Sequence, residues 1–125
     1  MGVSISSFGI EVGDLERSGA FYTQALGLSV AFTIDNDHLA EIALRNGDDG
    51  PSILLMRTKG TPNPGPEPKT GKLVLITDDV AILHAAAVAA GATSERDPEP
   101  YAGTSYTIGM VRDFDGNLIE LIQMA

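Results

Sequence analysis

The stretch FGIEVGDLERSGAFYTQALG, from Phe8 to Gly27, places an alternating strand before an acidic helix start and an amphipathic helix that ends at glycine. The second half of the chain repeats this order as LVLITDDVAILHAAAVAAG, from Leu73 to Gly91. Asp79 lies 65 positions after Asp14, about half of the chain, so one supersecondary unit is used twice. Paired modules create a cavity between them, and each module contributes equivalent positions to its wall.

The first copy predicts a β-α-β-β-β module. Strand alternation over residues 4–12 sets three apolar side chains against a core face: Phe8, Ile10 and Val12. Asp14 is the predicted N-cap of a helix that ends at Gly27. Further strands are predicted near residues 28–34, 39–44 and 52–57, with a turn over 46–50.

The second copy follows the same plan after a proline-rich segment. Residues 58–70 read TKGTPNPGPEPKT, whose alternate prolines favour extended geometry and predict a linker between modules. A ligand for an aromatic groove is the alternative interpretation of these prolines. Beyond the linker we expect a strand over 72–77, a helix capped by Asp78 or Asp79, and strands near 93–96, 105–111 and 118–124. The prediction is a single α+β domain over 1–125, with module one at 4–57, the linker at 58–70 and module two at 71–124.

The composition of the chain narrows the classes of function that it could have. The chain has 125 residues, 43% of them hydrophobic, and a formal net charge of -9. The acidic balance disfavours nucleic-acid backbones and anionic membranes as partners. No cysteine is present, which excludes disulfides and cysteine-based metal sites. No apolar run approaches a membrane span, so we expect a cytoplasmic protein.

Three segments resemble the vicinal oxygen chelate superfamily: VGDLERSGAFYTQALGL (12–28), TDDVAILHAAAVAAGA (77–92) and DFDGNLIELIQ (113–123). This superfamily includes glyoxalase I, extradiol dioxygenases, methylmalonyl-CoA epimerase and the bleomycin-resistance proteins. The resemblance covers essentially the whole chain and implies the glyoxalase/bleomycin resistance fold. In that fold two tandem βαβββ modules form a curved mixed sheet around a cavity. It also implies a homodimer, because family members cover sheet edges by pairing.

The resemblance further implies four metal-ligand positions, on the first and fourth strands of each module. Family enzymes place His or Gln on the first strand, seven residues before the helix-cap Asp, and Glu or His on the fourth. The matching positions here are Ser7, Leu55 (give or take one residue), Lys72 and Glu120. Lysine brings positive charge and leucine has no donor atom, so this set is a poor metal site. We therefore expect no metal and no cofactor.

Lys72 and Glu120 are the most informative of these positions. We predict that they form an ion pair which replaces the metal. The alternative is that Lys72 extends to solvent while a tyrosine or arginine bonds Glu120.

Other side chains are candidates for lining the cavity. Glu11 and Glu41 could bind a cationic ligand or serve as a base, or could be solvated strand charges. Tyr101 and Tyr106 could supply stacking surfaces and hydroxyls, or lie at the rim. The remaining ligand-binding candidates are Phe32, His38, Met110 and Arg112, although surface ion pairing is the alternative for the arginine. His84 is expected on the solvent side of its helix.

Two classes of function fit these observations. The first is a metal-independent protein that binds a small organic molecule in the cavity, as in sequestration of a drug or natural product. The second is a metal-free lyase, isomerase or epimerase that uses Glu120 or Glu41 as base with Lys72 as electrostatic partner. A metal-dependent glyoxalase or dioxygenase comes third, because it would need an unusual ligand such as His38.

Overall fold

The first helix begins where the sequence places it, and Asp14 is its N-cap. The Asp14 carboxylate accepts a hydrogen bond from the Arg17 amide at 3.0 Å. Asp79 caps the second helix in the same way, by accepting the Ile82 amide at 3.0 Å. The alternatives for the second cap, Asp78 and Asp79, are therefore resolved in favour of Asp79.

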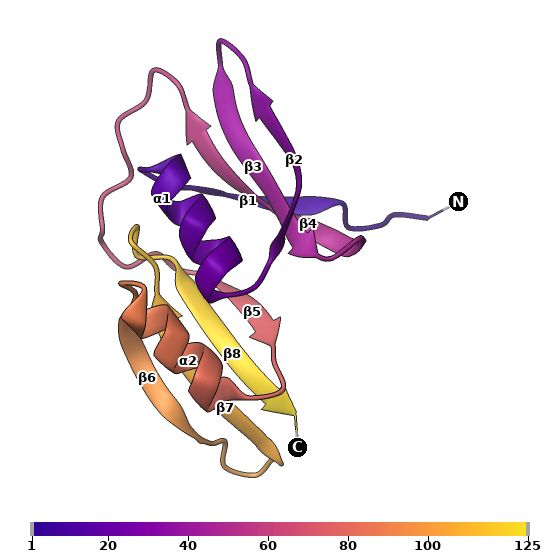
Figure 1. Cartoon of the computed structure of the whole chain (residues 1–125), viewed down its shortest axis with the longest axis vertical. Helices are drawn as coiled ribbons and strands as arrows, with labels where there is room; N and C mark the ends of the chain where they lie inside the picture. Colours follow the sequence, from indigo (N-terminus) through magenta and orange to yellow (C-terminus); the bar gives the residue numbers. More distant parts are fainter. Residues whose placement is uncertain (1, 125) are drawn as a thin grey trace. The chain divides into compact units, whose positions relative to one another are not determined.

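The computed structural model describes residues 2–124 and divides into two compact units, with the boundary between Pro64 and Gly65. The first unit contains β1 (Ser7–Glu11), α1 (Leu15–Ala20), the π-helix η1 (Phe21–Ala25), β2 (Ser29–Asp35), β3 (Leu39–Asn46) and β4 (Asp49–Thr58). The second unit contains β5 (Lys72–Ile76), α2 (Val80–Ala89), β6 (Thr93–Pro100), β7 (Tyr106–Arg112) and β8 (Leu118–Met124). The βαβββ order of both modules and the α+β class are confirmed (Figure 1).

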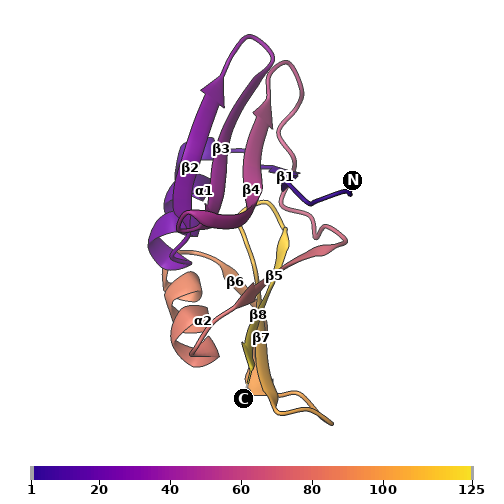
Figure 2. The ribbon, with the colours of Figure 1, turned by 90° about the vertical axis from the view of Figure 1, so that its right-hand side faces the viewer.

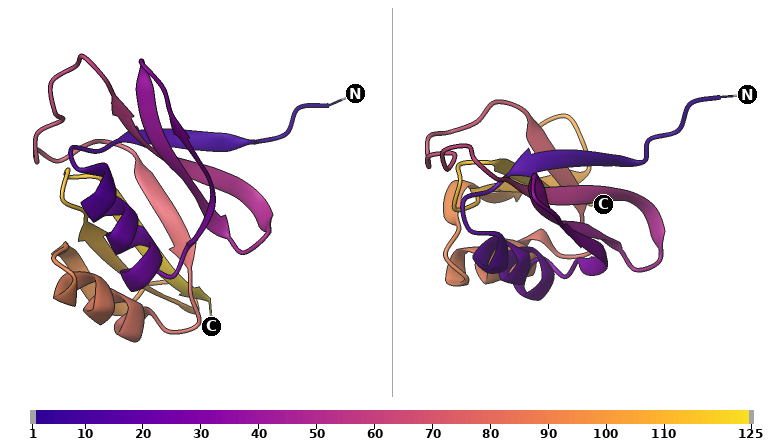
Figure 3. Two further views of the ribbon diagram at one scale, coloured as in Figure 1. Left: turned by 45° about the horizontal axis from the view of Figure 1, so that its top comes forward. Right: turned by 90° about the horizontal axis from the view of Figure 1, so that it is seen from above.

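Each unit forms a mixed four-stranded sheet of the same topology. The strand orders are β1-β4-β3-β2 and β5-β8-β7-β6. The first strand of each unit pairs in parallel with the last, and the other pairings are antiparallel. The helix between the first two strands covers one face of its own sheet, as Figure 2 shows for α2 and Figure 3 for α1. We call the other face of each sheet its open face.

The first unit buries its core between α1–η1 and the sheet. Val12, Tyr22 and Leu55 are completely buried, and the rings of Phe21 and Tyr22 meet edge to face with centroids 5.3 Å apart. The predicted single helix continues as a π-helix from Phe21, and Gly27 ends it with a φ of +80°.

Phe8 departs from the predicted core, because its side chain is 73% exposed. It lies on the edge strand β1, whereas α1 contacts β3 and β4. The core of this unit therefore lies under β3 and β4, farther from the sheet edge than the alternation of β1 suggests.

Several element boundaries also differ from the sequence expectation. The first strand begins at Ser7, and the turn between β3 and β4 spans only residues 47–48. β6 runs on to Pro100 through two prolines, where the sequence predicted an end at Arg96. Proline is tolerated there because β6 is an edge strand whose pairing with β7 is interrupted by bulges.

The predicted linker has two different halves. Thr58 ends β4, whereas residues 65–70 belong to the second unit. The Lys69 amide donates to the Gly116 carbonyl at 3.0 Å, and Arg112 Nη1 donates to the Lys69 carbonyl at 3.0 Å. The end of the proline-rich segment is therefore fastened to the turn between β7 and β8. None of the described helices is long and apolar enough to span a membrane.

Candidate functional site: the open faces of the two sheets

The open face of the second sheet follows from where its helix packs. A Cβ atom at Gly109 would lie 3.2 Å from Val80 Cγ1 and 3.4 Å from His84 Cδ2, so Gly109 faces α2. Neighbouring residues on a strand point to opposite faces. Met110 and its ladder partner Glu120 therefore lie on the open face. The same alternation places four more residues there: Lys72, Tyr106, Ile108 and Arg112.

Lys72 and Glu120 are paired on this face. Lys72 Nζ donates to Glu120 Oε1 at 3.1 Å. The Glu120 side chain is 10% exposed and that of Lys72 is 48% exposed. The predicted ion pair is confirmed, and the partner of Glu120 is the lysine rather than a tyrosine or arginine. Its carboxylate is thus neutralised by a group that also reaches solvent.

The unequal exposure of the two partners predicts unequal mutational effects. Lys72→Met leaves a buried carboxylate unpaired, and we expect it to destabilise the protein by about 1–3 kcal/mol. Glu120→Gln keeps a hydrogen-bond acceptor and lets the ammonium turn to water, so its cost should stay below about 1 kcal/mol. Urea unfolding followed by circular dichroism measures both values.

Lys59→Met is the matched control for this pair, because Lys59 forms an exposed ion pair with Asp35. We expect it to change stability by less than about 0.5 kcal/mol. A larger loss in Glu120→Gln than in Lys72→Met would contradict the assignment of the buried partner.

The equivalent position in the first unit is Leu54 rather than Leu55. Glu120 pairs with Val74 on β5, and the matching residue on β1, Gly9, pairs with Leu54. Leu55 instead pairs with Ile42 and is fully buried. A Cβ at Gly19 of α1 would lie 2.9 Å from Ile42 Cδ1, so this pair faces the helix. The predicted equivalence is corrected by one residue, within the margin that the sequence allowed.

Ser7 and Glu11 occupy the two ends of β1. Ser7 is exposed and lies opposite Ser52. Glu11 is held at its strand end by Thr58, whose amide and hydroxyl both donate to its carboxylate. Arg57 lies 3.9 Å from the same carboxylate. The charge of Glu11 is therefore compensated locally.

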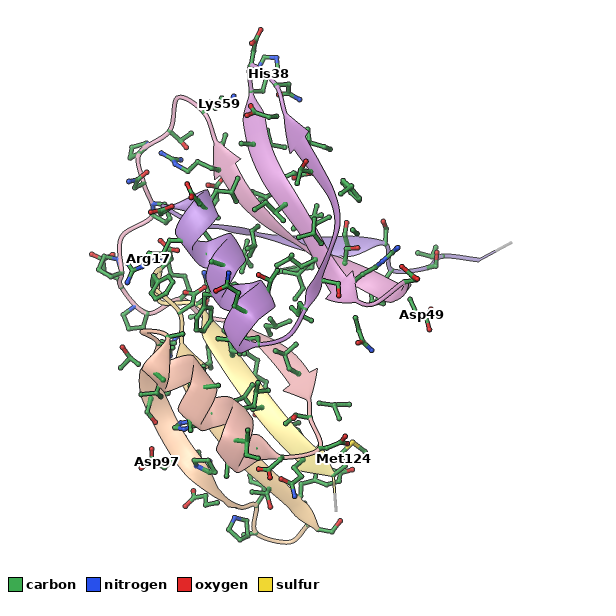
Figure 4. The ribbon with its side chains drawn as sticks, viewed as in Figure 1. Arg17, His38, Asp49, Lys59, Asp97 and Met124 are labelled. Atoms are coloured by element: carbon green, nitrogen blue, oxygen red, sulfur yellow. The ribbon has the colours of Figure 1, made fainter. Side chains whose placement is uncertain are left out.

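Glu41 and Phe32 lie on the open face of the first sheet. Glu41 is only 7% exposed as a residue, although its carboxylate oxygens are not among the fully buried atoms that lack a partner. Phe32 pairs with Ala43, which shares the face of Glu41, and its side chain is 49% exposed. His38 lies instead at the exposed tip of the β2–β3 hairpin (Figure 4). The structure does not bring it beside these residues within the first sheet.

The two tyrosines lie together where β6 turns into β7. The Tyr101 amide donates to the Tyr106 carbonyl at 2.9 Å, and both side chains are partly exposed. The Arg112 guanidinium already has hydrogen-bond partners in the second unit. Its Nη1 donates to the carbonyls of Lys69 and Gly116, and its Nη2 donates to Glu95 at 3.1 Å. The alternative interpretation of Arg112 as an ion-pairing residue is confirmed.

His84 lies on the helix-covered side of the second sheet and is 8% exposed, so its predicted solvent position is wrong. Its Nε2 lies 2.9 Å from Ser94 Oγ, which donates to Asp97 at 2.8 Å. The alanine-rich helix has little contrast between its faces, and so its buried side could not be located from sequence.

Apolar side chains complete the open faces, and most of them were not among the candidates that the sequence indicated. On the second sheet these are Val74, Ile76, Ile108, Ile122 and Met124, and on the first Ile34 and Leu54. Several are well exposed, with Ile76 at 71%. Once one residue of a strand is assigned to a face, the alternation of side chains along that strand assigns the others.

Within each unit, the residues at the two positions that the resemblance assigns to metal ligands fit a divalent ion poorly. Ser7 and Leu54 offer the first unit only a hydroxyl. In the second unit, the Glu120 carboxylate already accepts a hydrogen bond from the Lys72 ammonium, which a cation would have to displace.

The two βαβββ units, each with a helix on one face of its mixed sheet, define a protein of the glyoxalase fold class. The family model described as "Glyoxalase/Bleomycin resistance protein/Dioxygenase superfamily" matches residues 4–121. The chain belongs to this superfamily.

Relatives within the superfamily carry different functions. The chain is 32% identical over 118 residues to a probable lactoylglutathione lyase of Vibrio cholerae, covering 91% of this chain and 86% of the relative. Glyoxalase I from Zea mays superimposes with a TM-score of 0.85 at 26% identity, over 97% of this chain and 44% of the maize chain. The chain thus spans less than half of that protein. TnmS3, an antibiotic binding protein from Streptomyces sp. CB03234, superimposes with a TM-score of 0.76 at 25% identity, over 100% of this chain and 99% of TnmS3.

Proposed function

We propose that this protein binds a small organic molecule without a metal ion. The observation that carries the proposal is the hydrogen bond between Lys72 Nζ and Glu120 Oε1, at two of the four positions where the family places ligands. An ammonium in contact with the remaining carboxylate competes with a cation for the same charge. The apolar open faces support binding of an organic ligand, because small-molecule sites are mostly apolar with a few polar groups.

Sequestration of a drug or natural product is the specific version that we favour. The antibiotic binding protein TnmS3 is similar over the full length of this chain, which supports a binding role on this scaffold. Such a protein needs an apolar surface and orienting polar groups but no reacting centre. We further propose that it acts in the cytoplasm as a homodimer, for which mass measurement by light scattering in solution is the direct test.

Metal analysis separates this proposal from a metal enzyme. After purification without chelator, we expect well below one equivalent of nickel, zinc, iron or manganese per subunit by mass spectrometry. The hemithioacetal of methylglyoxal and glutathione should show no turnover with or without added Ni²⁺ or Zn²⁺. Thermal-shift screening against cationic drugs and aromatic metabolites should then reveal a stabilising ligand. One tightly bound ion per subunit together with turnover would overturn the proposal.

A metal-free lyase, isomerase or epimerase is the second candidate. The relatives named lactoylglutathione lyase favour an enzyme, and Glu120 and Glu41 are the carboxylates that could take a proton. Lys72 would then stabilise a developing enolate. Any turnover found without metal should be lost in Glu120→Gln or Glu41→Gln, and unchanged turnover in both variants would eliminate this candidate.

A further inference from the structure

Glu41 is a largely buried residue with no compensating partner in its own sheet. It is 7% exposed, and among residues 2–124 it takes part in no hydrogen bond or ion pair. The basic side chains of β4 and the segment after it bond elsewhere. Arg57 contacts Glu11 and Thr61, and Lys59 pairs with Asp35. The Glu41 carboxylate oxygens are not among the fully buried side-chain atoms that lack a partner, so they remain open to solvent and to a ligand.

The residues around Glu41 indicate which kind of ligand would bind beside its carboxylate. Its ladder partners on the open face are Met56 on β4 and Ile34 on β2. Phe32 lies two residues before Ile34 and so is a diagonal neighbour of Glu41 on the same face. The phenyl ring is about half exposed. A carboxylate beside an accessible aromatic ring and a thioether is a combination that attracts organic cations, through ion pairing and cation–π contact.

A comparison with Glu11 shows that the missing counter-charge is particular to Glu41. Both carboxylates flank Met56 in one row across the sheet. Thr58 and Arg57 already satisfy Glu11. The two acidic residues are thus not equivalent, and only one of them is left without a counter-charge.

We propose that Glu41 and Phe32 form a subsite for the positively charged nitrogen of an organic ligand, such as an alkylammonium or amidinium group. This inference rests on the proposed small-molecule binding function and specifies the charge of its ligand. The cation would pair with the Glu41 carboxylate while its apolar part lies against Phe32 and Met56.

Benzamidine and benzamide test the subsite, because they share size and shape and differ in charge. In a titration of the ¹⁵N-labelled full chain followed by NMR, millimolar benzamidine should shift the amides of Glu41, Ile42 and Met56 saturably. Benzamide should shift them at least about tenfold less effectively, the ratio expected for one charge-assisted contact. Glu41→Gln should weaken benzamidine binding by a similar factor, and Phe32→Leu by about threefold.

Glu16→Gln is the control, since it changes net charge equally at an exposed site on α1. It should leave benzamidine binding unchanged. The spectrum of each variant reports whether it is folded, and Glu41→Leu is a second variant if the amide is not tolerated. Because Glu41 takes part in no hydrogen bond or ion pair among residues 2–124, Glu41→Gln should melt close to the temperature of the unmodified chain.

Each outcome decides the proposal. Equal binding of benzamidine and benzamide, no shift by benzamidine, or equal binding by Glu41→Gln and Glu16→Gln would each overturn it. Equal binding of the two probes would leave the metal-independent binding function standing. A tightly bound metal ion with lyase turnover would remove that function while the charge selectivity at Glu41 could still be observed.

Discussion

Replacing Lys72 by histidine is expected to raise the affinity of the second unit for a divalent ion by at least about 100-fold. The substitution removes the ammonium that now bonds Glu120 at 3.1 Å and puts an imidazole on the same open face. One nitrogen ligand and one carboxylate ligand then lie on neighbouring strands of one sheet. We expect a dissociation constant in roughly the micromolar range for Zn²⁺ or Ni²⁺, about 8 kcal/mol of binding free energy.

Lys72→Met is the matched control for this gain. It removes the same ammonium but adds no metal ligand. We expect its affinity for the ion to be lower than that of Lys72→His by at least about tenfold, because it lacks the imidazole. Isothermal titration with the metal, after dialysis against chelator, measures both variants.

Failure of Lys72→His to bind the metal more tightly than Lys72→Met would contradict the placement of residue 72 beside Glu120 on the open face. Unmodified protein binding the metal as tightly as Lys72→His would show that other residues form a site.

Gly116→Ala is expected to destabilise the second unit by about 3 kcal/mol or more. Gly116 has a φ of +79°, and a Cβ there would lie 2.3 Å from the Glu67 carbonyl oxygen and 2.7 Å from that of Pro66. The substitution therefore adds left-handed strain and a clash with backbone that cannot simply rotate away. It should also release residues 65–70, because Lys69 and Arg112 bond to this same turn.

Gly103→Ala isolates the backbone strain from the clash. Gly103 has a φ of +81° but nothing lies within 4 Å of its Cβ position. Only the backbone conformation is then unfavourable, at about 1 kcal/mol. Urea unfolding should rank the two variants in this order. Equal destabilisation would show that the proline-rich segment does not pack on Gly116.

The duplication and the ion pair could both be predicted from the sequence because they depend on local rules. Two cap aspartates with equal surroundings locate two modules, and both caps form as expected. Lys72 and Glu120 fall on strands that neighbour each other in any βαβββ module, so their pairing followed from topology. The first-strand positions that the resemblance assigns to ligands, Ser7 and Lys72, likewise depended only on counting from the caps.

The fourth-strand position shows where counting fails. The stretch from Asp14 to Leu54 is one residue shorter than that from Asp79 to Glu120. A constant offset therefore slips by one residue, and in a strand such a slip moves the side chain to the opposite face. Only the hydrogen-bonded register between β1 and β4 resolved it.

Burial of polar groups was decided by tertiary structure alone. His84 and Glu41 are both more than nine-tenths buried, where the sequence indicated a solvated side chain for His84 and left both a cavity position and a solvated position open for Glu41. Sequence patterns report the average tendency of a residue type, whereas burial depends on what neighbouring strands and helices place above it. The His84 ring lies within hydrogen-bond distance of the Ser94 hydroxyl on β6, whereas Glu41 takes part in no hydrogen bond among residues 2–124. The sequence by itself determined the two modules and the caps of their helices, and the tertiary structure decided which side chain faces which surface, because strand register sets that choice.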